Sequence, residues 1–344
     1  MNILVTGGAG YIGSHVVKEI LEKRSDNVVI LDNFSTGSRR NTDTLKKIDV
    51  NGRLKIIEAD LSNFSLVEGI FKSYYFDAII HFAASIIVPE SVENPLKYYM
   101  NNTVNTTNLI RLANNYGVKR FIFSSTAAVY GEPEEVPVKE TTILSPINPY
   151  GMSKLMSERV LIDTAKANND FKYVILRYFN VAGADMNNAK TIEDINPRIG
   201  QAFPEATHLI KVAAETATGK RDKIYIFGDD YDTKDGTCIR DYIHVDDLAM
   251  AHLQALDYLN ENESDIFNCG YGHGYTVKEV INTMKKVSGV DFKVGITGRR
   301  AGDPSKLIAD NSKILNKLGW QPKFDNLELI CKSAFEWEKR LDLA

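Results

Sequence analysis

The stretch ILVTGGAGYIGSH, residues 3–15, decides how the N-terminal half of the chain folds. A short apolar run ends at Gly7, and Gly10 and Gly13 follow at intervals of three before the amphipathic stretch SHVVKEILEKR begins. This order of strand, glycine turn and helix is typical of a unit that holds a pyrophosphate against the free N–H groups of the first helical turn. A glycine-rich turn by itself would equally suit an ordinary loop.

Asp32 supports the dinucleotide interpretation. It ends the second apolar run, NVVILDN, 19 residues beyond Gly13. A carboxylate at this point can accept hydrogen bonds from an adenosine ribose and would repel a 2′-phosphate. We therefore predict NAD rather than NADP as the cofactor. Two alternatives remain open at this point: Arg39 and Arg40 could hold a 2′-phosphate, and Asp32 could be a plain turn residue.

Six short apolar runs alternate with amphipathic stretches through the first half of the chain. The runs are NILVTG, NVVILDN, LKIIEAD, FDAIIHFAA, KRFIFSS and FKYVILRYFN. They are rich in Val, Ile and Phe and end in polar or small residues, which is typical of buried parallel strands. Stretches such as FSLVEGIFKSY and NTTNLIRLANNYG are the expected helices between them. The pattern predicts an α/β fold, a Rossmann-type doubly wound parallel sheet that binds ligands at the carboxyl ends of its strands.

The pattern changes after Asn180. A polar stretch, VAGADMNNAKTIEDINPRIGQAFPEATHLI, is expected to be a long connection. Shorter elements follow, namely KIYIFGDDY, CIRDYIHVDDLAMAHLQALDYL, DIFNCGYGHG, TVKEVINTMKKVSG and a final helix. We expect an NAD-binding domain over residues 1–180, with segments returning to it from about 230–265, and a smaller C-terminal α/β lobe over 181–344 that binds the substrate.

Composition excludes several classes of protein. The chain has 344 residues, 44% hydrophobic and 25% charged, with a net charge of -4 and no basic block, which argues against nucleic acid as a partner. Cys238, Cys269 and Cys331 lie far apart, as expected for a reducing compartment without a disulfide framework. We expect no signal peptide, because the first apolar run starts at Ile3 and stops by Gly7. The sequence has no apolar span of 18 residues, and its histidines lack metal-ligand spacing. We expect a cytoplasmic protein without a membrane partner or a metal.

A tyrosine and a lysine stand four residues apart in NPYGMSK, residues 148–154. On a helix, Tyr150 and Lys154 would share one face. An ammonium about 5 Å from the phenol, at an effective dielectric of about 20, would favour the phenolate by about 3 kcal/mol, or about two pKa units. The charge of NAD+ would lower the pKa of Tyr150 further. The pair could therefore take a proton from an alcohol, although a chance pairing on a solvated face remains the alternative.

With SSTAAVYG and NPYGMSK, the glycine turn resembles the extended short-chain dehydrogenase/reductase family. The stretches HFAA, NPLKYYMNN, LRYFNVAGA, FGDDYDTKDGTCIRDYIHVDDLA and RRAGDPSKLIAD resemble the UDP-galactose (UDP-glucose) 4-epimerases in particular. The likeness runs from Ile3 to about Trp337. It implies a tightly bound NAD that is not consumed, oxidation at C4 of a nucleotide-linked hexose, and return of the hydride to the other face of the sugar.

The resemblance also implies roles for individual residues. Tyr150 would be the base, Lys154 would lower its pKa and bond the nicotinamide ribose, and Thr126 would bond the sugar oxygen and relay its proton. The implied cofactor-binding positions are Gly7, Gly10, Tyr11, Ile12, Gly13, Asp32, Asn33, Ser35, Asp60, Leu61, Phe82, Ala83, Ala84, Asn101, Ser124, Tyr150, Lys154 and Phe179. The implied substrate-binding positions are Thr126, Tyr150, Asn180, Leu209, Tyr225, Phe227, Arg240, Arg300, Asp303 and Leu307.

Ala127 and Ala128 separate an epimerase from its relatives. The 4,6-dehydratases resemble one another in placing an Asp-Glu pair after the threonine, because loss of water needs a further acid and base. Two methyl groups cannot transfer protons, which favours epimerisation at C4. The alternatives are another NAD-dependent nucleotide-sugar enzyme, such as a UDP-glucuronate epimerase or decarboxylase, and a non-catalytic NAD sensor. Sensors usually lack a complete set of tyrosine, lysine and hydroxyl group.

The substrate range depends on Leu307. Members limited to non-acetylated sugars resemble one another in carrying tyrosine at this position, and the smaller leucine leaves room for a 2-acetamido group. We therefore expect turnover of UDP-GlcNAc and UDP-GalNAc too, unless neighbouring side chains refill the space.

Two departures from the family are Ile86, where some members have a lysine near the nicotinamide, and the poorly matching segment 186–207. A homodimer is also expected, through the helices predicted around PLKYYMNNTVNTTNLIRLANNYG and YGMSKLMSERVLIDTAKAN.

Overall fold

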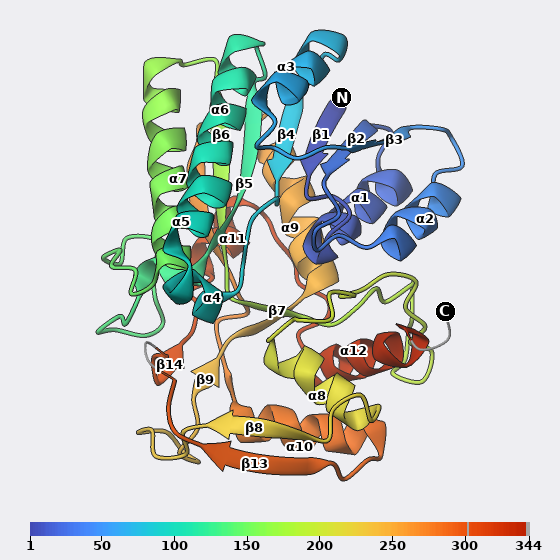
Figure 1. Cartoon of the computed structure of the whole chain (residues 1–344), viewed down its shortest axis with the longest axis vertical. Coiled ribbons are helices and arrows are strands. Elements are labelled where there is room, and N and C mark those ends of the chain that lie inside the picture. Colours follow the sequence, from blue (N-terminus) through green and yellow to red (C-terminus); the bar gives the residue numbers. More distant parts are fainter. Residues whose placement is uncertain (301–302, 342–344) are drawn as a thin grey trace.

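The computed structural model describes residues 1–300 and 303–341. Its largest sheet has the strand order β11-β6-β5-β4-β1-β2-β3 and every neighbouring pair is parallel (Figure 1). The first six strands in chain order confirm the six expected ones. Their bounds are β1 (Asn2–Thr6), β2 (Asn27–Asp32), β3 (Leu54–Glu58), β4 (Ala78–His81), β5 (Arg120–Thr126) and β6 (Lys172–Tyr178).

The seventh strand is β11 (Asp265–Cys269), whose stretch DIFNC was expected among the shorter elements after Asn180. It begins where the segments expected to return to the first domain, at about 230–265, end. In the structure this segment pairs with β6, with Asp265 opposite Val174 and Cys269 opposite Tyr178, and so extends the large sheet at one edge. Its hydrogen bonds come from a strand about 90 residues earlier in the chain, which no local pattern reveals. The division of the chain into two domains remains a prediction.

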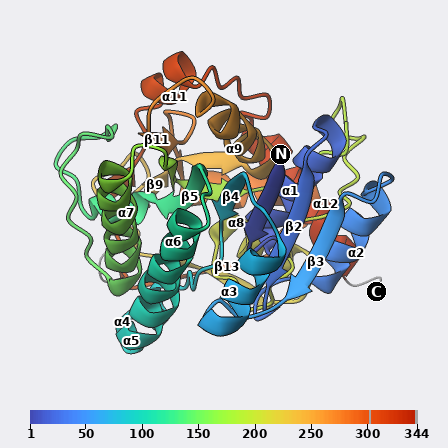
Figure 2. The ribbon, with the colours of Figure 1, turned by 90° about the horizontal axis from the view of Figure 1, so that it is seen from above.

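Helices cover both faces of the large sheet (Figure 2). One side carries α1 (Tyr11–Lys23), α2 (Arg39–Ile48) and α9 (Val245–Tyr258), and the other carries α3 (Phe64–Ser73), α6 (Asn105–Asn115) and α7 (Pro149–Ala167). Ile3 and Val5 of β1 belong to the core under α1 and α9, whereas Leu4 belongs to the core under α3 and α6. Because both faces are buried, the strands appear in the sequence as continuous apolar runs.

The chain enters α7 at a point that the local sequence fixes. The Asn148 side chain accepts a hydrogen bond from the Gly151 N–H at 2.9 Å, and Pro149 occupies the first helical turn. Both are typical of a helix N-terminus. Tyr150 therefore lies in the first turn of α7 and Lys154 one turn later. The preceding helical segments are α4 (Val88–Glu93), α5 (Pro95–Tyr98) and a π-helical turn, η1 (Tyr99–Val104), which continues into α6.

Except for α11, which packs on β11, the remaining elements gather beyond the carboxyl ends of the large sheet. Residues 183–208 carry no helix or strand, as expected for the long connection. The small sheets are β7 (Asn180–Ala182) with β10 (Tyr242–His244), β8 (Lys223–Phe227) with β13 (Lys293–Thr297), and β12 (Tyr275–Thr276) with β9 (Ile239–Arg240) and β14 (Lys306–Leu307). The helices are α8 (Leu209–Ala217), α10 (Val277–Ser288), α11 (Ser312–Lys317) and α12 (Leu327–Leu341).

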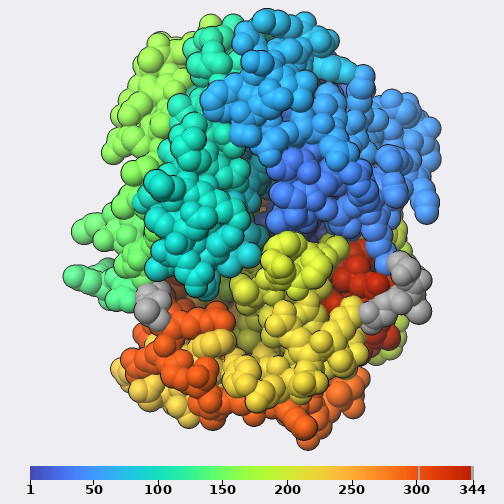
Figure 3. All heavy atoms as spheres, in the orientation of Figure 1, coloured from blue at the N-terminus to red at the C-terminus, as the bar shows by residue number. Residues whose placement is uncertain are grey.

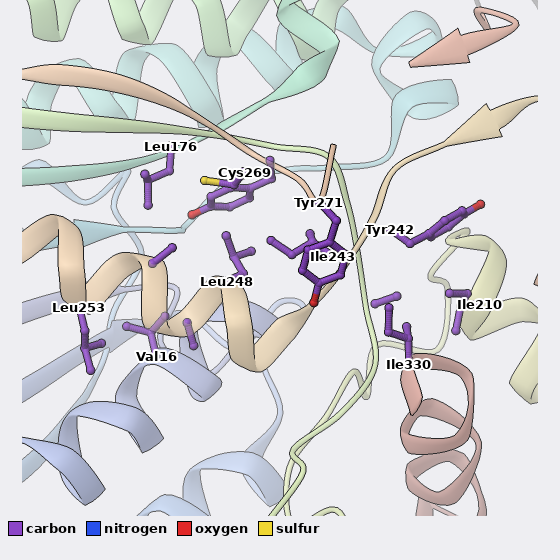
Figure 4. Close-up of a cluster of buried hydrophobic side chains, with 14 of the residues drawn as sticks. Val16, Leu176, Ile210, Tyr242, Ile243, Leu248, Leu253, Cys269, Tyr271 and Ile330 are labelled. Atoms are coloured by element: carbon purple, nitrogen blue, oxygen red, sulfur yellow. The ribbon is translucent and has the colours of Figure 1, made fainter. Parts of the chain in front are cut away.

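One apolar cluster joins these elements to the Rossmann sheet. Figure 4 shows Val16 of α1, Leu176 of β6 and Leu248 of α9 in the same cluster as Ile243 of β10 and Ile330 of α12. In the space-filling view, the N-terminal half meets the C-terminal elements along a seam across the molecule (Figure 3). Continuous packing across this seam fixes the C-terminal elements over the strand ends, where ligands of doubly wound sheets bind. Within the described ranges, every helix is too short or too polar to cross a membrane.

Candidate active site

The glycine turn packs against the end of β4 so tightly that side chains would not fit. A Cβ atom on Gly7 would lie 2.7 Å from the Ala83 nitrogen, and one on Gly13 would lie 2.3 Å from the Gly7 carbonyl oxygen. Gly7 also has a φ of +70°, which favours glycine. Gly10 caps α1 without any side-chain hydrogen bond to the helix. The first N–H groups of α1, at Tyr11 and Ile12, are thus arranged as at a phosphate site.

Four of the predicted adenosine-side residues lie together at the ends of β2 and β3. The buried Asp32 carboxylate accepts hydrogen bonds from the N–H groups of Ala9 (2.9 Å) and Phe34 (2.8 Å). Burial raises the pKa of Asp32, and these two N–H groups offset part of the rise. Asn33 donates to Asp60 at 2.6 Å and accepts from the Ser35 N–H at 3.0 Å. The neighbouring Leu61 is buried.

The two arginines that could have favoured NADP have other partners. Arg39 forms an exposed ion pair with Glu58 at 2.8 Å. Arg40 donates to the Arg340 carbonyl oxygen at 2.8 Å, and its guanidinium lies 5.2 Å from the Trp337 ring centroid. Arg39 also lies 4.3 Å from the Phe34 ring centroid, but its guanidinium bonds Glu58, and the Asp32 carboxylate is bonded by two backbone N–H groups. This geometry favours the unphosphorylated ribose of NAD.

Thr126, Tyr150 and Lys154 meet where β5 ends and α7 begins. Thr126 hydrogen-bonds the phenol of Tyr150 and caps the 3₁₀ turn η2 (Ala127–Tyr130) by accepting from the Ala128 N–H at 3.1 Å. Lys154 is 3% exposed, and its Nζ donates to the Ser124 carbonyl oxygen at 2.8 Å. The hydroxyl, the phenol and the ammonium therefore lie at the same junction of β5 and α7.

The expected pKa shift of Tyr150 is wrong for the protein alone. Desolvation raises the pKa of Tyr150, and the hydrogen bond from Thr126 lowers it only in part. Burial lowers the pKa of Lys154 to about 7, although the Glu158 carboxylate raises it. The estimate from spacing assumed a permanently charged lysine in a medium of moderate dielectric. Burial of both groups acts in the opposite direction, because it disfavours the phenolate and the ammonium alike.

The remaining cofactor-side positions surround the end of β4. Ala83 and Ala84 follow this strand, and the ring centroid of Phe82 lies 4.9 Å from that of His252. Asn101 donates to Ser85 Oγ at 3.0 Å. Phe179 is buried, and its N–H donates to the Cys269 carbonyl oxygen. Ile86 is 43% exposed and offers no polar atom in its side chain.

Asn102, the neighbour of Asn101, was not among the predicted site residues. It is 1% exposed and exchanges hydrogen bonds with the Ser85 backbone, at 2.8 Å and 3.0 Å. It also donates to Ser153 Oγ, between Tyr150 and Lys154, at 3.0 Å. The π-helical turn places it there, and such turns are frequent at functional sites. In the sequence, the position of Asn102 directly after Asn101 was the feature that could have pointed to it.

Five of the predicted substrate-side positions form contacts with one another or with the catalytic end of the sheet. Arg240 forms an ion pair with Asp303. The Arg300 guanidinium lies 3.6 Å from the Phe227 ring centroid. Burial lowers the pKa of Arg300 and Asp303 raises it. Leu307 pairs with Arg240 across β14 and β9 and packs on the cluster that contains Ala127 and Phe179.

The other substrate-side positions lie further apart. Asn180 and Leu209 both line a cavity between β7, α8 and α12, together with Gly183 and His208. Tyr225 is 42% exposed, and the Lys223 ammonium lies 4.8 Å from its ring centroid. No contact joins Tyr225 to Arg240 or Arg300 among the described residues, although Phe227 follows it by two positions on the same strand.

Known proteins match this chain over nearly its whole length. The sequence model of the GDP-mannose 4,6 dehydratase family matches residues 4–333. UDP-glucose 4-epimerase of Azospirillum brasilense is 47% identical over 341 residues, covering 99% of this chain and 92% of that protein. The solved structure of the UDP-Glc/GlcNAc 4-epimerase from Campylobacter jejuni is 62% identical, with a TM-score of 0.84 and coverage of 98% and 99% of the two chains.

A further solved structure, UDP-glucose 4-epimerase from Bifidobacterium longum in complex with NAD+ and UDP, is 36% identical, with a TM-score of 0.92 and coverage of 99% and 98%. The family model carries the name of a dehydratase, but Ala127 and Ala128 occupy the positions after Thr126. The relatives of highest identity among these are 4-epimerases. The chain therefore belongs to the extended short-chain dehydrogenase/reductase family of nucleotide-sugar enzymes and, within it, to the UDP-glucose 4-epimerases.

Proposed function

We propose that this chain interconverts UDP-glucose and UDP-galactose by NAD-dependent epimerisation at C4 of the hexose. The observation that carries the proposal is the convergence of Thr126, Tyr150 and Lys154, followed directly by Ala127 and Ala128. This site can remove and return one hydroxyl proton. It offers no acid or base at the two alanines with which to eliminate water.

The chain fits a dinucleotide. The turn at Gly7, Gly10 and Gly13 is a cradle in which added Cβ atoms would collide with main chain, so the backbone itself faces the bound group. The first turn of α1 would hold the pyrophosphate, and Asp32 would accept hydrogen bonds from the adenosine ribose. When bound, NAD supplies the acceptor and donor of the hydride at C4. The chain supplies orientation and proton transfer.

Tyr150 is the proposed base, and Thr126 bonds the same sugar oxygen. Since burial raises the pKa of Tyr150, the phenolate needs compensating positive charge. Lys154 and the cationic ring of the cofactor together would provide it, by the opposite-charge effect. Lys154, which contacts the Ser124 carbonyl oxygen in this structure, would also bond the nicotinamide ribose.

The UDP group needs firm anchoring because the hexose must present either face at C4. Arg240 and Arg300 are the proposed partners of the diphosphate, since guanidinium groups bind phosphates in a forked geometry. Asp303 forms an ion pair with Arg240 in this structure, and the Arg240 guanidinium would bind both this carboxylate and the diphosphate of the nucleotide. Asn180, Leu209, Tyr225 and Phe227 are the remaining proposed contacts.

The substrate range extends to the acetylated pair, UDP-GlcNAc and UDP-GalNAc. Leu307 lies opposite Arg240 and packs near Ala127, between the proposed diphosphate and hexose positions. Leucine leaves more space there than tyrosine. The relative with 62% identity is a UDP-Glc/GlcNAc 4-epimerase, which supports the same range.

We further propose a cytoplasmic homodimer. The helical stretch from α5 to α6 lies beside α7 in Figure 1, and three large apolar side chains are exposed there: Leu96 (73%), Met100 (59%) and Met156 (42%). A second copy of this chain would cover them. Light scattering should give twice the chain mass, and Leu96→Asp should shift the equilibrium toward monomer. A monomeric native chain at micromolar concentration would contradict the proposed dimer.

The function is tested by incubating the purified chain with each of the four UDP-hexoses and separating the products by chromatography. We expect each sugar to yield its C4 epimer without added NAD, because the cofactor is held tightly. The matched control is Tyr150→Phe, which keeps the ring. Absence of any epimer, together with no change in the reduced-nicotinamide absorbance, would instead favour an NAD sensor.

A further inference from the structure

A buried ion pair lies directly behind the catalytic residues. Glu158 follows Lys154 by one helical turn on α7 and is 1% exposed. Its carboxylate accepts hydrogen bonds from Arg177 Nη2 at 2.7 Å and Nε at 3.0 Å, and Arg177 is 2% exposed. Charges this deeply buried are retained only where their hydrogen bonds are nearly complete. The proposed reaction uses neither group.

This pair holds the strand end that forms the site. Ser125 Oγ donates to Glu158. Ser125 stands between Ser124, whose carbonyl oxygen receives the Lys154 ammonium, and Thr126, which bonds Tyr150. Glu158 thus links α7, which carries the base, to the three residues of β5 on which the base and its partner depend.

The network continues on the side away from Lys154. Arg177 Nη1 donates to the Tyr130 hydroxyl at 3.0 Å and to the Glu140 carbonyl oxygen at 3.3 Å. The Tyr130 hydroxyl donates to Asn268 Oδ1 at 2.7 Å. Strands β6 and β11 and the turn η2 are therefore tied to the same carboxylate through Arg177.

Glu158 is also the anion that acts on Lys154. The titratable groups that act on the Lys154 ammonium are Glu158 on α7 and His81 on β4, while Tyr150 on α7 and Tyr178 on β6 lie next to each other beside them. Burial lowers the pKa of His81 to about 3 and raises that of Tyr178, so both are neutral near pH 7. The Glu158 carboxylate raises the pKa of Lys154 against the larger effect of burial.

We propose that Glu158, held by Arg177, is a positioning residue that keeps Lys154 protonated and fixes the Ser124–Thr126 strand end against α7. The inference rests on the proposed function in that Lys154 assists Tyr150. The state of Lys154 can nevertheless be measured without any turnover, so the two proposals can fail separately.

The test compares the native chain with Glu158→Gln and a matched control, Glu338→Gln. Glu338 lies on α12 and is equally buried, with 1% of its surface exposed. Its carboxylate accepts a hydrogen bond from Lys211 at 2.5 Å. The titration midpoint of Lys154 is followed by NMR of isotope-labelled lysine side chains, with its signal assigned from its loss in Lys154→Arg. We expect E158Q to lower the midpoint by on the order of one pH unit, since an anion one helical turn away is removed. E338Q should leave it unchanged.

The kinetic counterpart is the pH profile of epimerisation. In E158Q the alkaline limb of kcat should move to lower pH while KM for UDP-glucose stays near its native value. A native chain without epimerase activity would refute the proposed function, and the Lys154 midpoint would still decide this inference. An E158Q midpoint equal to the native one overturns it.

A second variant covers the case in which E158Q does not fold. The double variant Glu158→Gln/Arg177→Met removes both members of the buried pair and leaves no uncompensated ion, so it should fold where E158Q does not. The midpoint of Lys154 should fall in this variant too, because the anion that acts on the ammonium is gone. Circular dichroism establishes that each variant is folded. A folded double variant with an unchanged or raised midpoint also overturns the proposal.

Discussion

Lys154 directs its ammonium at the main-chain carbonyl oxygen of Ser124, 2.8 Å away, and not at the phenol of Tyr150 that shares its helix face. A carbonyl oxygen is a partner that every residue type provides, so this contact does not depend on the side chain at position 124. It holds the ammonium at the end of β5, two residues before Thr126. From there the positive charge can act on Tyr150 through space without a direct hydrogen bond.

Tyr150→Phe should abolish proton transfer while leaving the fold intact. The ring edge that packs on Tyr98 remains, because only the hydroxyl is lost. We expect kcat to fall by on the order of 10²–10⁴-fold, the range for loss of a general base. KM and NAD content should change little. Product formation at the native rate would contradict the proposed role of the phenol.

Lys154→Met should change the pH dependence of the rate, unlike Tyr150→Phe. Methionine fills a similar volume but removes the charge and the bond to Ser124. The rate should fall by a comparable factor at pH 7 and recover in part at higher pH, because the phenol then ionises without help. The pH profile of kcat between pH 7 and pH 10 distinguishes this from a mere loss of structure. A pH-independent loss would exclude an electrostatic role for Lys154.

Leu307→Tyr should narrow the substrate range. The added ring and hydroxyl would enter the space beside Ala127 and Phe179, where a 2-acetamido group is proposed to lie. We expect kcat/KM for UDP-GlcNAc to fall by on the order of 10–100-fold, with UDP-glucose retained within a few fold. Leu307→Ala, which adds no bulk, is the control and should keep both activities. Equal losses on both sugars would show that Leu307 only packs.

Asp32→Asn should weaken NAD without creating an NADP enzyme. The amide keeps the shape but accepts fewer hydrogen bonds than the carboxylate that Ala9 and Phe34 now share. Retention of NAD should fall by on the order of 10–100-fold. NADP should not bind comparably, since Arg39 is paired with Glu58 and Arg40 with the Arg340 carbonyl oxygen. Isothermal titration with both nucleotides measures this, and tight NADP binding would contradict it.

The fold could be predicted where its signal is local. Ile3, Leu4 and Val5 face alternate sides of a doubly covered sheet, so β1 appears as an unbroken apolar run. β11 carries polar residues at Asp265 and Asn268, and its place depends on hydrogen bonds to a distant strand. Whether β11 belongs to the large sheet therefore depends on tertiary contacts and cannot be predicted from its own residues.

The same distinction applies to the site. The glycine turn and the four-residue spacing of Tyr150 and Lys154 are local patterns, and the structure brings those residues together. The direction of the pKa shifts of Tyr150 and Lys154 cannot be predicted from the local sequence, because it depends on how deeply β5, β6 and α7 bury both side chains. Glu158 is four residues beyond Lys154 and was visible in the sequence. Its role depends on the ion pair with Arg177, which lies on β6 and not on α7.

Asp185 provides a test of how the long connection 183–208 is held. Its buried carboxylate lies 2.9 Å from the Lys18 ammonium and 2.7 Å from Arg198 Nε, and joins the connection to α1. Burial raises the pKa of Asp185, but the charge of Lys18 and the bonds from Arg198 and Lys18 outweigh it, so the net pKa is lowered.

A carboxyl group whose pKa is lowered by folding stabilises the protein above its unfolded pKa of about 4, and this stability is lost as the pH falls through the folded value. Asp185→Asn should therefore cost about 3 kcal/mol or more of unfolding free energy at pH 7, because Lys18 and Arg198 lose a buried anion. The deficit should shrink below about pH 4, because the Asp185 carboxyl then takes up a proton in the unfolded chain while it stays ionised in the folded one. Glu22→Gln is the control, since Glu22 bonds the same Arg198 from a more exposed position and should cost about 0.5 kcal/mol. Urea unfolding of the three proteins at pH 7 and at pH 3.5 measures these differences. A deficit in D185N that is the same at both pH values would show that the carboxylate charge contributes nothing to holding the connection in place.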